Sequence, residues 1–427
     1  MTLQLPKGTR DLKPEEAIIR NRIVSALKEV FELYGYAPLE TPVFERYDIL
    51  ASKYAGGEEI LKETFKFRDQ GKRELGLRYD LTVPLARYVG MNPNIKMPFK
   101  RYQVGEVFRD GPVENARYRQ FTQCDVDVVG IKGMTADAEI IALAQSAFKK
   151  LGLEIVIKVN NRKLLNKLLL YAGVKKEKLD TVLLTIDKFE KFGLDTIKKE
   201  LKDKKIDNKT INEIIKIINI KGNNNEKINK IKNIIKKSEG IDEIEELISL
   251  LAILKANVDF DVSLARGLSY YTGTVIEVYL KDSSVKSAVC AGGRYDEMIG
   301  SFLSKGSFPA VGISFGLDRI YDEYAEKIKS QKKTVTQIYI IPINAFNESL
   351  KIAEELRNEN VKVDIDLTGK SPSKNLQYAN SLGIPYVLFI GEDELKQGKV
   401  KLRDMKSGEE KLMSAEELII FLDKNLG

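Results

Sequence analysis

The chain has 427 residues and contains 69 Lys and Arg against 62 Asp and Glu, a formal net charge of +7, but it has no histidine. The absence of imidazole excludes Ser-His-Asp and Cys-His catalytic triads and zinc sites with histidine ligands. Any catalysis must therefore use carboxylates, tyrosines, arginines, lysines or a metal bound through oxygen, and the modest positive charge allows a nucleic-acid partner without requiring one.

The length predicts two or three domains, and contents of 43% hydrophobic and 31% charged residues are ordinary for a protein with hydrophobic cores. The two cysteines, Cys124 and Cys290, lie in apolar stretches. We interpret them as reduced, buried thiols of a cytoplasmic protein rather than as a disulfide. No stretch approaches the roughly 18 apolar residues of a membrane span, and the N-terminal segment lacks the apolar core of a signal peptide, so we expect no membrane association.

The first part of the chain, residues 1–159, is predicted to mix helices and strands. A helix should start at Pro14, because apolar residues then recur on one helical face up to Gly35. Strands are predicted over residues 99–108 and 120–129, followed by a helix over 136–151.

Residues 160–259 differ in composition from the rest, because they are rich in Lys, Ile and Asn and poor in aromatic residues. This stretch predicts an inserted helical domain with a break at residues 222–225. The earlier composition then returns over residues 260–329, with strands expected near 270–279 and 285–290 and a helix over 317–329. One domain is therefore interrupted by another.

Beyond a charged, hinge-like stretch at residues 326–334, strands and helices alternate through the last part of the chain. We predict strands over 337–343, 361–366 and 386–390, and helices over 349–358, 374–382 and 415–424. This alternation is typical of a small α/β domain with a mostly parallel sheet, which we assign to residues 330–427.

The strand at 120–129 carries the densest group of polar residues. Gln123, Asp125 and Asp127 share one face, since successive side chains of a strand alternate between faces. A solvated outer face is the simpler explanation. The charged residues just before it, Arg101 and Arg109 among them, instead suggest two strands that line a polar cavity.

Four other segments allow both a functional and a structural interpretation. The tyrosine pair in residues 265–273 can hold a ring or simply alternate along a strand, and the glycine pair in 290–296 can admit a ligand or form a bulge. An arginine in the first turn of the helix after 310–316 could meet a phosphate. The carboxylate and hydroxyl of residues 80–82 could face one ligand or form a turn or helix cap.

Taken in order, these segments resemble the histidyl-tRNA synthetase family of class II aminoacyl-tRNA synthetases. Residues 5–11 (LPKGTRD) resemble the N-terminal signature, Glu40-Thr41-Pro42 resembles motif 1, and residues 108–109 with 117–121 resemble motif 2. Residues 316–319 resemble motif 3, and the most specific segments are ARGLSYYTG at 265–273 and AGGRY at 291–295. One departure is Ser269, where the family usually has aspartate.

The resemblance implies an α+β fold: a class II catalytic core with an antiparallel sheet and flanking helices, a helical insertion near the tRNA acceptor stem, and a C-terminal α/β anticodon-binding domain. It also implies ATP-dependent activation of L-histidine to histidyl-adenylate, with Mg²⁺ and no prosthetic group. The histidyl group would then pass to the 3′ end of tRNA(His), in a homodimer with Pro42 at its interface. A carboxylate nucleophile needs no general base, so the absence of histidine is compatible with this reaction. The absence of histidine also excludes the class I fold, whose HIGH signature contains histidines.

Residue roles also follow from the resemblance. Arg109 would bind the α-phosphate, Arg319 the γ-phosphate, and Arg266 would bridge the substrate carboxylate and the α-phosphate, while no protein metal ligand is assigned. Gln123 and Asp127 lie four residues apart, roughly 13 Å along a strand, which leaves room for one small amino acid. The remaining assignments are ATP binding by Arg117 and Arg119, binding of the α-amino end by Asp80, Leu81, Thr82 and Gln123, ring binding by Asp127 and Tyr271, and pocket walls from Tyr270 and Tyr295.

Three alternatives stay open at this point. The first is a non-catalytic paralogue that senses histidine, of the type of the ATP phosphoribosyltransferase regulatory subunit. The others are a class II synthetase for another amino acid and a generic RNA-binding module. The presence of Arg109, Arg266 and Arg319 and of a complete C-terminal domain favours an active synthetase.

Overall fold

The structure is a computed structural model that describes residues 2–52, 61–113, 118–267, 270–303, 307–328 and 333–426. The chain forms two compact units. One comprises the residues up to Arg10 and those from Arg22 to Lys327, and the other comprises Asp11–Asn21 and the residues from Ile328 onward. None of the described helices combines the length and the apolar composition that a membrane span requires.

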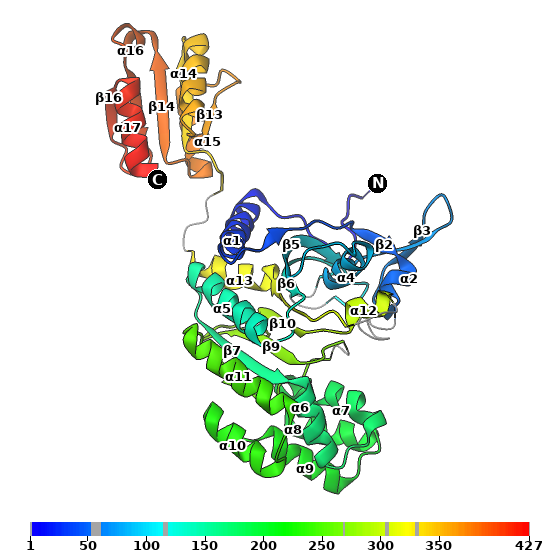
Figure 1. The fold of residues 1–427 in the computed structure, drawn as a ribbon. Helices are drawn as coiled ribbons and strands as arrows, with labels where there is room; N and C mark the ends of the chain where they lie inside the picture. The colour runs from blue at the N-terminus through cyan, green and yellow to red at the C-terminus, as the bar shows by residue number, and fades with distance from the viewer. Residues whose placement is uncertain are drawn as a thin grey trace. The chain divides into compact units, whose positions relative to one another are not determined.

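An eight-stranded mixed sheet forms the centre of the larger unit (Figure 1). Its inner strands pair antiparallel, and only the two outermost pairs, β1–β5 and β7–β8, are parallel. In spatial order the strands are β1 (Ala37–Pro38), β5 (Phe99–Phe108), β6 (Gln120–Val129), β11 (Ala310–Gly316), β10 (Cys290–Arg294), β9 (Thr274–Leu280), β7 (Ile155–Asn161) and β8 (Asp259–Phe260).

The two faces of this sheet differ in chemistry because side chains alternate along β6. Cys124, Val126 and Val128 are buried on the face that packs against α1 (Pro14–Leu33) and α5 (Thr135–Lys150). Aromatic rings complete that core: the Phe315 ring centroid lies 5.4 Å from Phe31 of α1 and 5.6 Å from Phe148 of α5. The opposite face of β6 is therefore left to polar residues.

The polar face is bordered by smaller elements. The helices α4 (Thr82–Met91) and α12 (Met298–Leu303) pack on each other through Leu85, Val89 and Ile299. A separate three-stranded sheet lies beside them. It consists of β2 (Phe44–Arg46), β4 (Glu74–Leu77) and β3 (Lys66–Arg68), with α2 (Tyr47–Leu50) packed against it.

Several predicted elements are confirmed, and three others differ from the structure. The predicted strands at 99–108 and 120–129 and the helix start at Pro14 agree with β5, β6 and α1. The strand expected at 285–290 begins only at Cys290, and the helix expected over 317–329 is α13 (Leu317–Lys327), which ends two residues earlier. Residues 290–294 pair in unbroken register with β11, and residues 290–293 do so with β9, so the glycine pair forms no bulge. Instead, a Cβ at Gly292 would lie 2.0 Å from the Gly312 carbonyl oxygen, which only glycine avoids.

Helices fill the stretch between β7 and β8, with a core made mainly of isoleucine and leucine. A capping box of Asn223 and Glu226 starts α10, at the predicted break. The elements are α6 (Arg162–Tyr171), η1 (Lys176–Lys178), α7 (Leu179–Ile186), α8 (Phe189–Asp203), α9 (Asn208–Ile218), α10 (Asn224–Ile234) and α11 (Glu239–Ile253).

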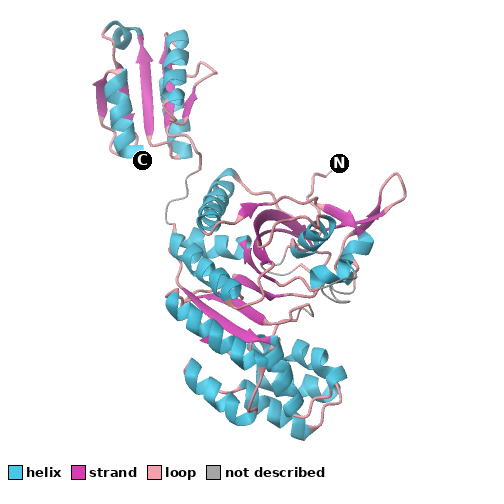
Figure 2. Cartoon of the chain, viewed as in Figure 1, coloured by secondary structure: helices cyan, strands magenta, loops and turns pink. Residues whose placement is uncertain are grey.

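The smaller unit is an α/β domain with a five-stranded sheet (Figures 1 and 2). The prediction of a mostly parallel sheet is only partly right, because β15 and β16 add an antiparallel edge with few apolar residues to reveal it. Helices α14 and α17 share one core and α15 contributes to another. The strands are β13 (Val363–Ile365), β12 (Ile338–Ile343), β14 (Tyr386–Gly391), β15 (Val400–Asp404) and β16 (Glu410–Met413), and the helices are α14 (Phe346–Asn358), α15 (Pro372–Leu382), α16 (Glu392–Lys396) and α17 (Ala415–Leu426).

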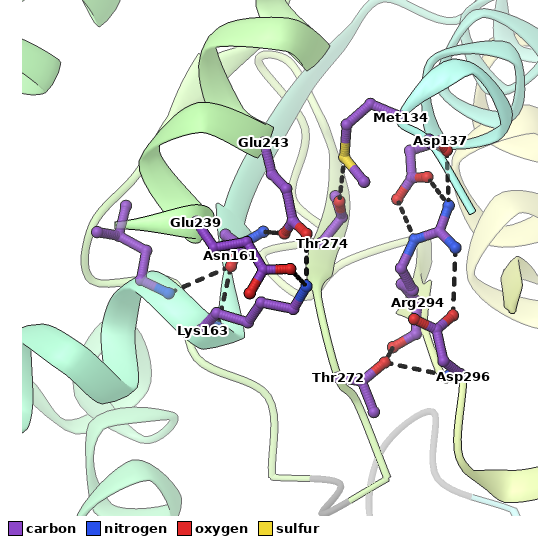
Figure 3. A network of polar contacts seen from close by, with 12 residues as sticks. Met134, Asp137, Asn161, Lys163, Glu239, Glu243, Thr272, Thr274, Arg294 and Asp296 are labelled. Carbon is purple, nitrogen blue, oxygen red and sulfur yellow. Dashed lines mark hydrogen bonds and ion pairs between the residues drawn. The ribbon is translucent and has the colours of Figure 1, made fainter. Parts of the chain in front are cut away.

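A buried arginine locks β10 to the start of α5 (Figure 3). Arg294 is 1% exposed and forms an ion pair with Asp137, which is also buried. Its guanidinium also donates to the Gly133 and Ile131 carbonyl oxygens, each at 3.0 Å, and to Asp296 at 3.2 Å. The guanidinium is therefore paired on several sides, which a buried charge requires.

We predict that Asp137→Asn lowers the free energy of unfolding of the larger unit by about 3–5 kcal/mol, because it leaves the Arg294 charge buried without its counterion. Urea denaturation of the full chain, followed by circular dichroism, measures this change. The control is Asp393→Asn, at a side chain that is 90% exposed, and we expect it to change stability by less than about 0.5 kcal/mol. A small effect of Asp137→Asn would contradict the assigned role.

Candidate active site

A cavity of about 100 Å³ lies on the polar face of the sheet. Strands β6, β10 and β11 form its floor, and the segment before α4 and the tyrosine-rich segment before β9 border it. Eight of the nine residues predicted to bind histidine line this cavity: Asp80, Thr82, Gln123, Asp127, Arg266, Tyr270, Tyr271 and Tyr295. Arg109 lines it as well.

Asp127 is held from two sides. Its carboxylate forms an ion pair with Arg101 at 2.7 Å and accepts a hydrogen bond from the Tyr295 hydroxyl. Burial raises the pKa of Asp127, while the Arg101 charge and the Tyr295 hydrogen bond oppose that shift. A Cβ at Gly312 would lie 1.8 Å from Asp127 Oδ1, so glycine is required there for the carboxylate to occupy this position.

The segment 80–82 starts a helix rather than extending as a strand, so the alternative of a helix cap describes its local structure correctly. Asp80 accepts a hydrogen bond from the Val83 N–H at 3.0 Å, and α4 begins at Thr82. Burial raises the pKa of Asp80 to about 6, opposed by the Val83 hydrogen bond and the Arg109 charge. Leu81 does not line the cavity: its side chain is fully buried, and its carbonyl accepts from Arg101 at 3.2 Å.

Three arginines from distant segments lie close to one another at this site. Arg266 forms an ion pair with Glu277, Arg109 donates to the Tyr79 carbonyl at 3.3 Å, and Arg319 donates to the Ala288 carbonyl at 2.7 Å. Burial and the positive charges of Arg266 and Arg109 lower the pKa of Arg319. Such mutual repulsion among cations favours binding of a polyanion.

Two other predicted residues that the structure describes, Arg119 and Pro42, lie outside the cavity lining. Arg119 forms an ion pair with Asp110 at 3.2 Å, and its backbone N–H donates to the Gly8 carbonyl at 2.8 Å, which ties motif 2 to the N-terminal signature. Pro42 is exposed. Arg117 and Ser269 fall outside the described residues.

The sequence analysis assigns no role to five residues at the site. It predicts the strand face of Asp125 correctly but gives that residue no function. Arg101 lies opposite Asp127 in the β5–β6 register, and the sequence does not reveal this pairing. Tyr79 and Ser314 line the cavity, and Glu277 pairs with Arg266. Glu277 is the only charged residue in the sequence of β9, and this is the signal that could have indicated a charged partner.

Comparison with known families agrees with this geometry. A family model described as "Histidyl-tRNA synthetase" matches residues 8–320. The chain belongs to this family. A second model, described as "Anticodon binding domain", matches residues 337–425, so the fold is that of a class II synthetase with a C-terminal anticodon-binding domain.

Full-length relatives support the assignment. "Histidine--tRNA ligase 1" of Bacillus cereus (strain ZK / E33L) is 44% identical over 418 residues, covering 96% of this chain and 97% of that protein. "Histidine--tRNA ligase" of Bacteroides fragilis (strain YCH46) is 38% identical over 454 residues, covering 98% of this chain and 99% of that protein. The crystal structure of histidyl-tRNA synthetase from Nostoc sp. PCC 7120 superposes with a TM-score of 0.88 at 29% identity, covering 99% of each chain.

Proposed function

We propose that this chain activates L-histidine with ATP and transfers the histidyl group to the 3′ end of tRNA(His) in the cytoplasm. The observation that carries the proposal is the arrangement of charge at the site. A small cavity lined by carboxylates, an amide and tyrosines adjoins three arginines. An ammonium and an imidazole fit the first environment, and a triphosphate fits the second.

The first chemical step needs cations rather than a base. The histidine carboxylate, already ionised at neutral pH, attacks the α-phosphorus of ATP. A carboxylate oxygen–phosphorus bond forms, the bond to the bridging oxygen breaks, and pyrophosphate leaves. Arg266 and Arg109 would stabilise the charge on the α-phosphoryl oxygens, and Arg319 would bind the departing phosphates.

The amino-acid end of the cavity would select histidine by pairing its polar groups. Asp80, Thr82 and Gln123 would bind the α-amino group, and the ring would lie near Asp127 and Tyr271. Tyr270 and Tyr295 would form walls, with ring centroids 6.2 Å apart at an interplanar angle of 76°. Analogues that cannot satisfy these buried groups would be rejected strongly, because an unmatched buried polar group is costly.

We propose that Mg²⁺ enters with ATP. Within the described ranges no group of three or more His, Cys, Asp or Glu side chains is placed to hold a metal ion. Mg²⁺ commonly binds substrate phosphates with only one or two carboxylates, so this donor set is compatible with the metal as a partner of the nucleotide. There it would neutralise phosphate charge.

We favour an active enzyme over a non-catalytic paralogue. A structure named as an ATP phosphoribosyltransferase regulatory subunit/histidyl-tRNA synthetase from Bacillus halodurans C superposes with a TM-score of 0.76 at 24% identity, which reflects a shared fold alone. Arg109 and Arg266 line the cavity of this chain, and Arg319 lies close enough to repel both. A sensor of free histidine would not need this cluster of cations.

We propose that residues 1–159 and 260–329 form the catalytic core, 160–259 an insertion near the tRNA acceptor stem, and 330–427 the domain that binds the anticodon. A hollow of about 740 Å³ lies at the carboxyl ends of β12 and β13, where α14 and α15 begin. Phe346, Leu367 and Lys370 line it, and the first two are exposed. An exposed aromatic ring beside a lysine suits an unstacked base and its phosphate.

We also propose a homodimer with Pro42 at its interface. The two residues that follow it, Val43 and Phe44, are 40% and 55% exposed, so an apolar strip adjoins the proline. The Pro42 carbonyl accepts from Arg78, which is buried and also donates to the Thr41 and Glu106 carbonyls. Arg78 therefore holds the backbone of motif 1 in place.

Arg266→Ala should reduce histidine-dependent ATP–pyrophosphate exchange by about 100-fold or more, because it removes a cation that stabilises the transition state. Circular dichroism verifies the fold, and Arg357→Ala on the exposed side of α14 serves as the control with unchanged exchange. Near-normal exchange by a folded Arg266→Ala protein would exclude a catalytic role for this arginine.

Asp80→Asn should raise the KM for histidine by about 10-fold or more while the KM for ATP stays within about 2-fold, because the amide keeps the Val83 hydrogen bond but loses the charge that pairs with the ammonium. Since the pKa of Asp80 is raised to about 6, exchange is measured at pH 8, where the carboxylate is ionised. Asp48→Asn, at an exposed site, is the matched control. Equal changes in both KM values would move Asp80 out of the amino-acid site.

Phe346→Ala should raise the KM for tRNA in histidylation of bulk tRNA by about 10-fold, the scale of one lost base stack, and leave pyrophosphate exchange unchanged. Ile420→Ala, at a side chain of α17 that is 57% exposed, should change neither measurement. An unchanged KM for tRNA would place the bases elsewhere.

A further inference from the structure

Arg10 has no role in the proposed mechanism, although the segment that carries it is fixed by contacts. The N–H and the hydroxyl of Thr9 both donate to the Pro6 carbonyl oxygen, at 3.1 and 2.8 Å, and close a tight turn. Gly8 within this turn has a φ of +85°, a conformation that residues other than glycine rarely adopt. The turn therefore sets the direction in which the chain reaches Arg10.

This turn lies directly against motif 2. The Gly8 carbonyl accepts a hydrogen bond from the Arg119 N–H at 2.8 Å, and the Arg119 carbonyl accepts one from the Arg109 N–H at 2.8 Å. A Cβ at Gly8 would lie 2.7 Å from Arg119 Cγ and 2.9 Å from Val113 Cγ2, so only glycine permits this approach. The N-terminal segment is therefore linked through Arg119 to the backbone of Arg109, which we place at the α-phosphate.

The Arg10 guanidinium joins motif 2 to the first turn of α13. It forms an ion pair with Asp318 Oδ1 at 2.6 Å and donates to the Tyr118 hydroxyl at 3.2 Å. Its central carbon also lies 4.4 Å from the centroid of the Tyr118 ring, which is a cation–π contact. One side chain of the N-terminal segment therefore connects two segments that are distant from each other in the sequence.

Asp318 is engaged from two sides. Arg10 pairs with Oδ1, and Oδ2 accepts from the backbone N–H of Thr122 on β6 at 3.4 Å. The side chains of Arg10 and Asp318 are 27% and 13% exposed, so solvent screens this ion pair less than a surface pair. The start of α13 is thus held to β6 and to the N-terminal segment at the residue that immediately precedes Arg319.

Arg319 needs such an anchor because neighbouring charges repel it. Burial and the charges of Arg266 and Arg109 lower the pKa of Arg319, and the Asp318 carboxylate opposes this shift. The Arg319 guanidinium itself donates to the Ala288 carbonyl at 2.7 Å. Like charges would drive this side chain away from the cavity, so a fixed backbone at its base helps to keep it beside the other two arginines.

The charges that face Arg10 stabilise it in this position. Burial lowers the pKa of Arg10, but Asp318, Tyr118 and Asp322 together raise it above its usual value. Arg10 does not line the cavity. It can therefore influence the substrates only through the residues that it holds.

We infer that Arg10 is a positioning residue for the triphosphate site. It acts through Asp318 on Arg319 and through Tyr118 on motif 2, without touching ATP or the amino acid. This inference rests on the proposed function and deepens it, because it gives the N-terminal segment the task of holding two phosphate-binding arginines at a fixed spacing. Loss of the Arg10 charge should weaken ATP binding and leave the amino-acid end of the cavity unchanged.

The first test compares Arg10→Ala, Arg10→Gln and Arg10→Lys with the unmodified chain in ATP–pyrophosphate exchange. The alanine and glutamine variants should raise the KM for ATP by about 10-fold, the scale of one hydrogen bond to a charged group, while the KM for histidine stays within about 2-fold. The lysine variant keeps the charge but not the planar guanidinium, so its KM for ATP should return to within about 3-fold. Arg22→Ala, at an exposed position of α1, is the control and should change neither KM.

The second test is a double-mutant cycle with Asp318→Asn, and circular dichroism verifies the fold of each variant. If Arg10 acts through Asp318, the double variant should raise the KM for ATP no more than the larger single change, since residues in contact are non-additive. Multiplied effects of the two substitutions, an unchanged KM for ATP in folded Arg10 variants, or equal increases in both KM values would overturn the positioning role. Absence of histidine-dependent exchange in the unmodified chain would instead refute the proposed function.

Discussion

The ion pair between Arg101 and Asp127 is the interaction on which the polar face of the sheet depends. Arg101 is completely buried, and a guanidinium in that position would be strongly unfavourable without a carboxylate at contact distance. The two residues lie directly opposite each other on β5 and β6, so the register of these strands and the charge balance of the floor determine each other. A slip of β5 by one residue would turn Arg101 toward the apolar core and leave Asp127 without its counterion.

The site as a whole brings carboxylates and arginines together over a short distance. Carboxylates and tyrosines line the cavity together with Arg109 and Arg266, and Arg319 comes from a third segment close enough for both charges to lower its pKa. Charges of the same sign repel one another within each group, so each group favours a ligand of opposite charge. The carboxylates and arginines therefore provide charges that complement both a zwitterionic amino acid and a polyphosphate at one site.

Much of this arrangement is readable from the sequence, because alternation along a strand is a local property. The polar row of β6 and the helical face after Pro14 follow directly from spacing. Partners in space are not local: nothing in the sequence states that Arg101 meets Asp127 or that Arg294 meets Asp137. The same holds for Gly292 of β10 and Gly312 of β11. Each must be glycine because atoms of the neighbouring strand occupy the space that a Cβ would need. The sequence does not predict the antiparallel strands β15 and β16 of the C-terminal sheet, because both contain mostly polar residues.

The helical stretch between β7 and β8 leaves the sheet and returns to it at neighbouring positions. Val159 pairs with Phe260, and parallel strands lie only about 4.8 Å apart. The 100 residues between them thus form an insertion whose two ends lie side by side in paired strands of the sheet. Helices added to or removed from this stretch would therefore leave the β7–β8 pairing, and with it the register of the strands that carry the active site, unchanged.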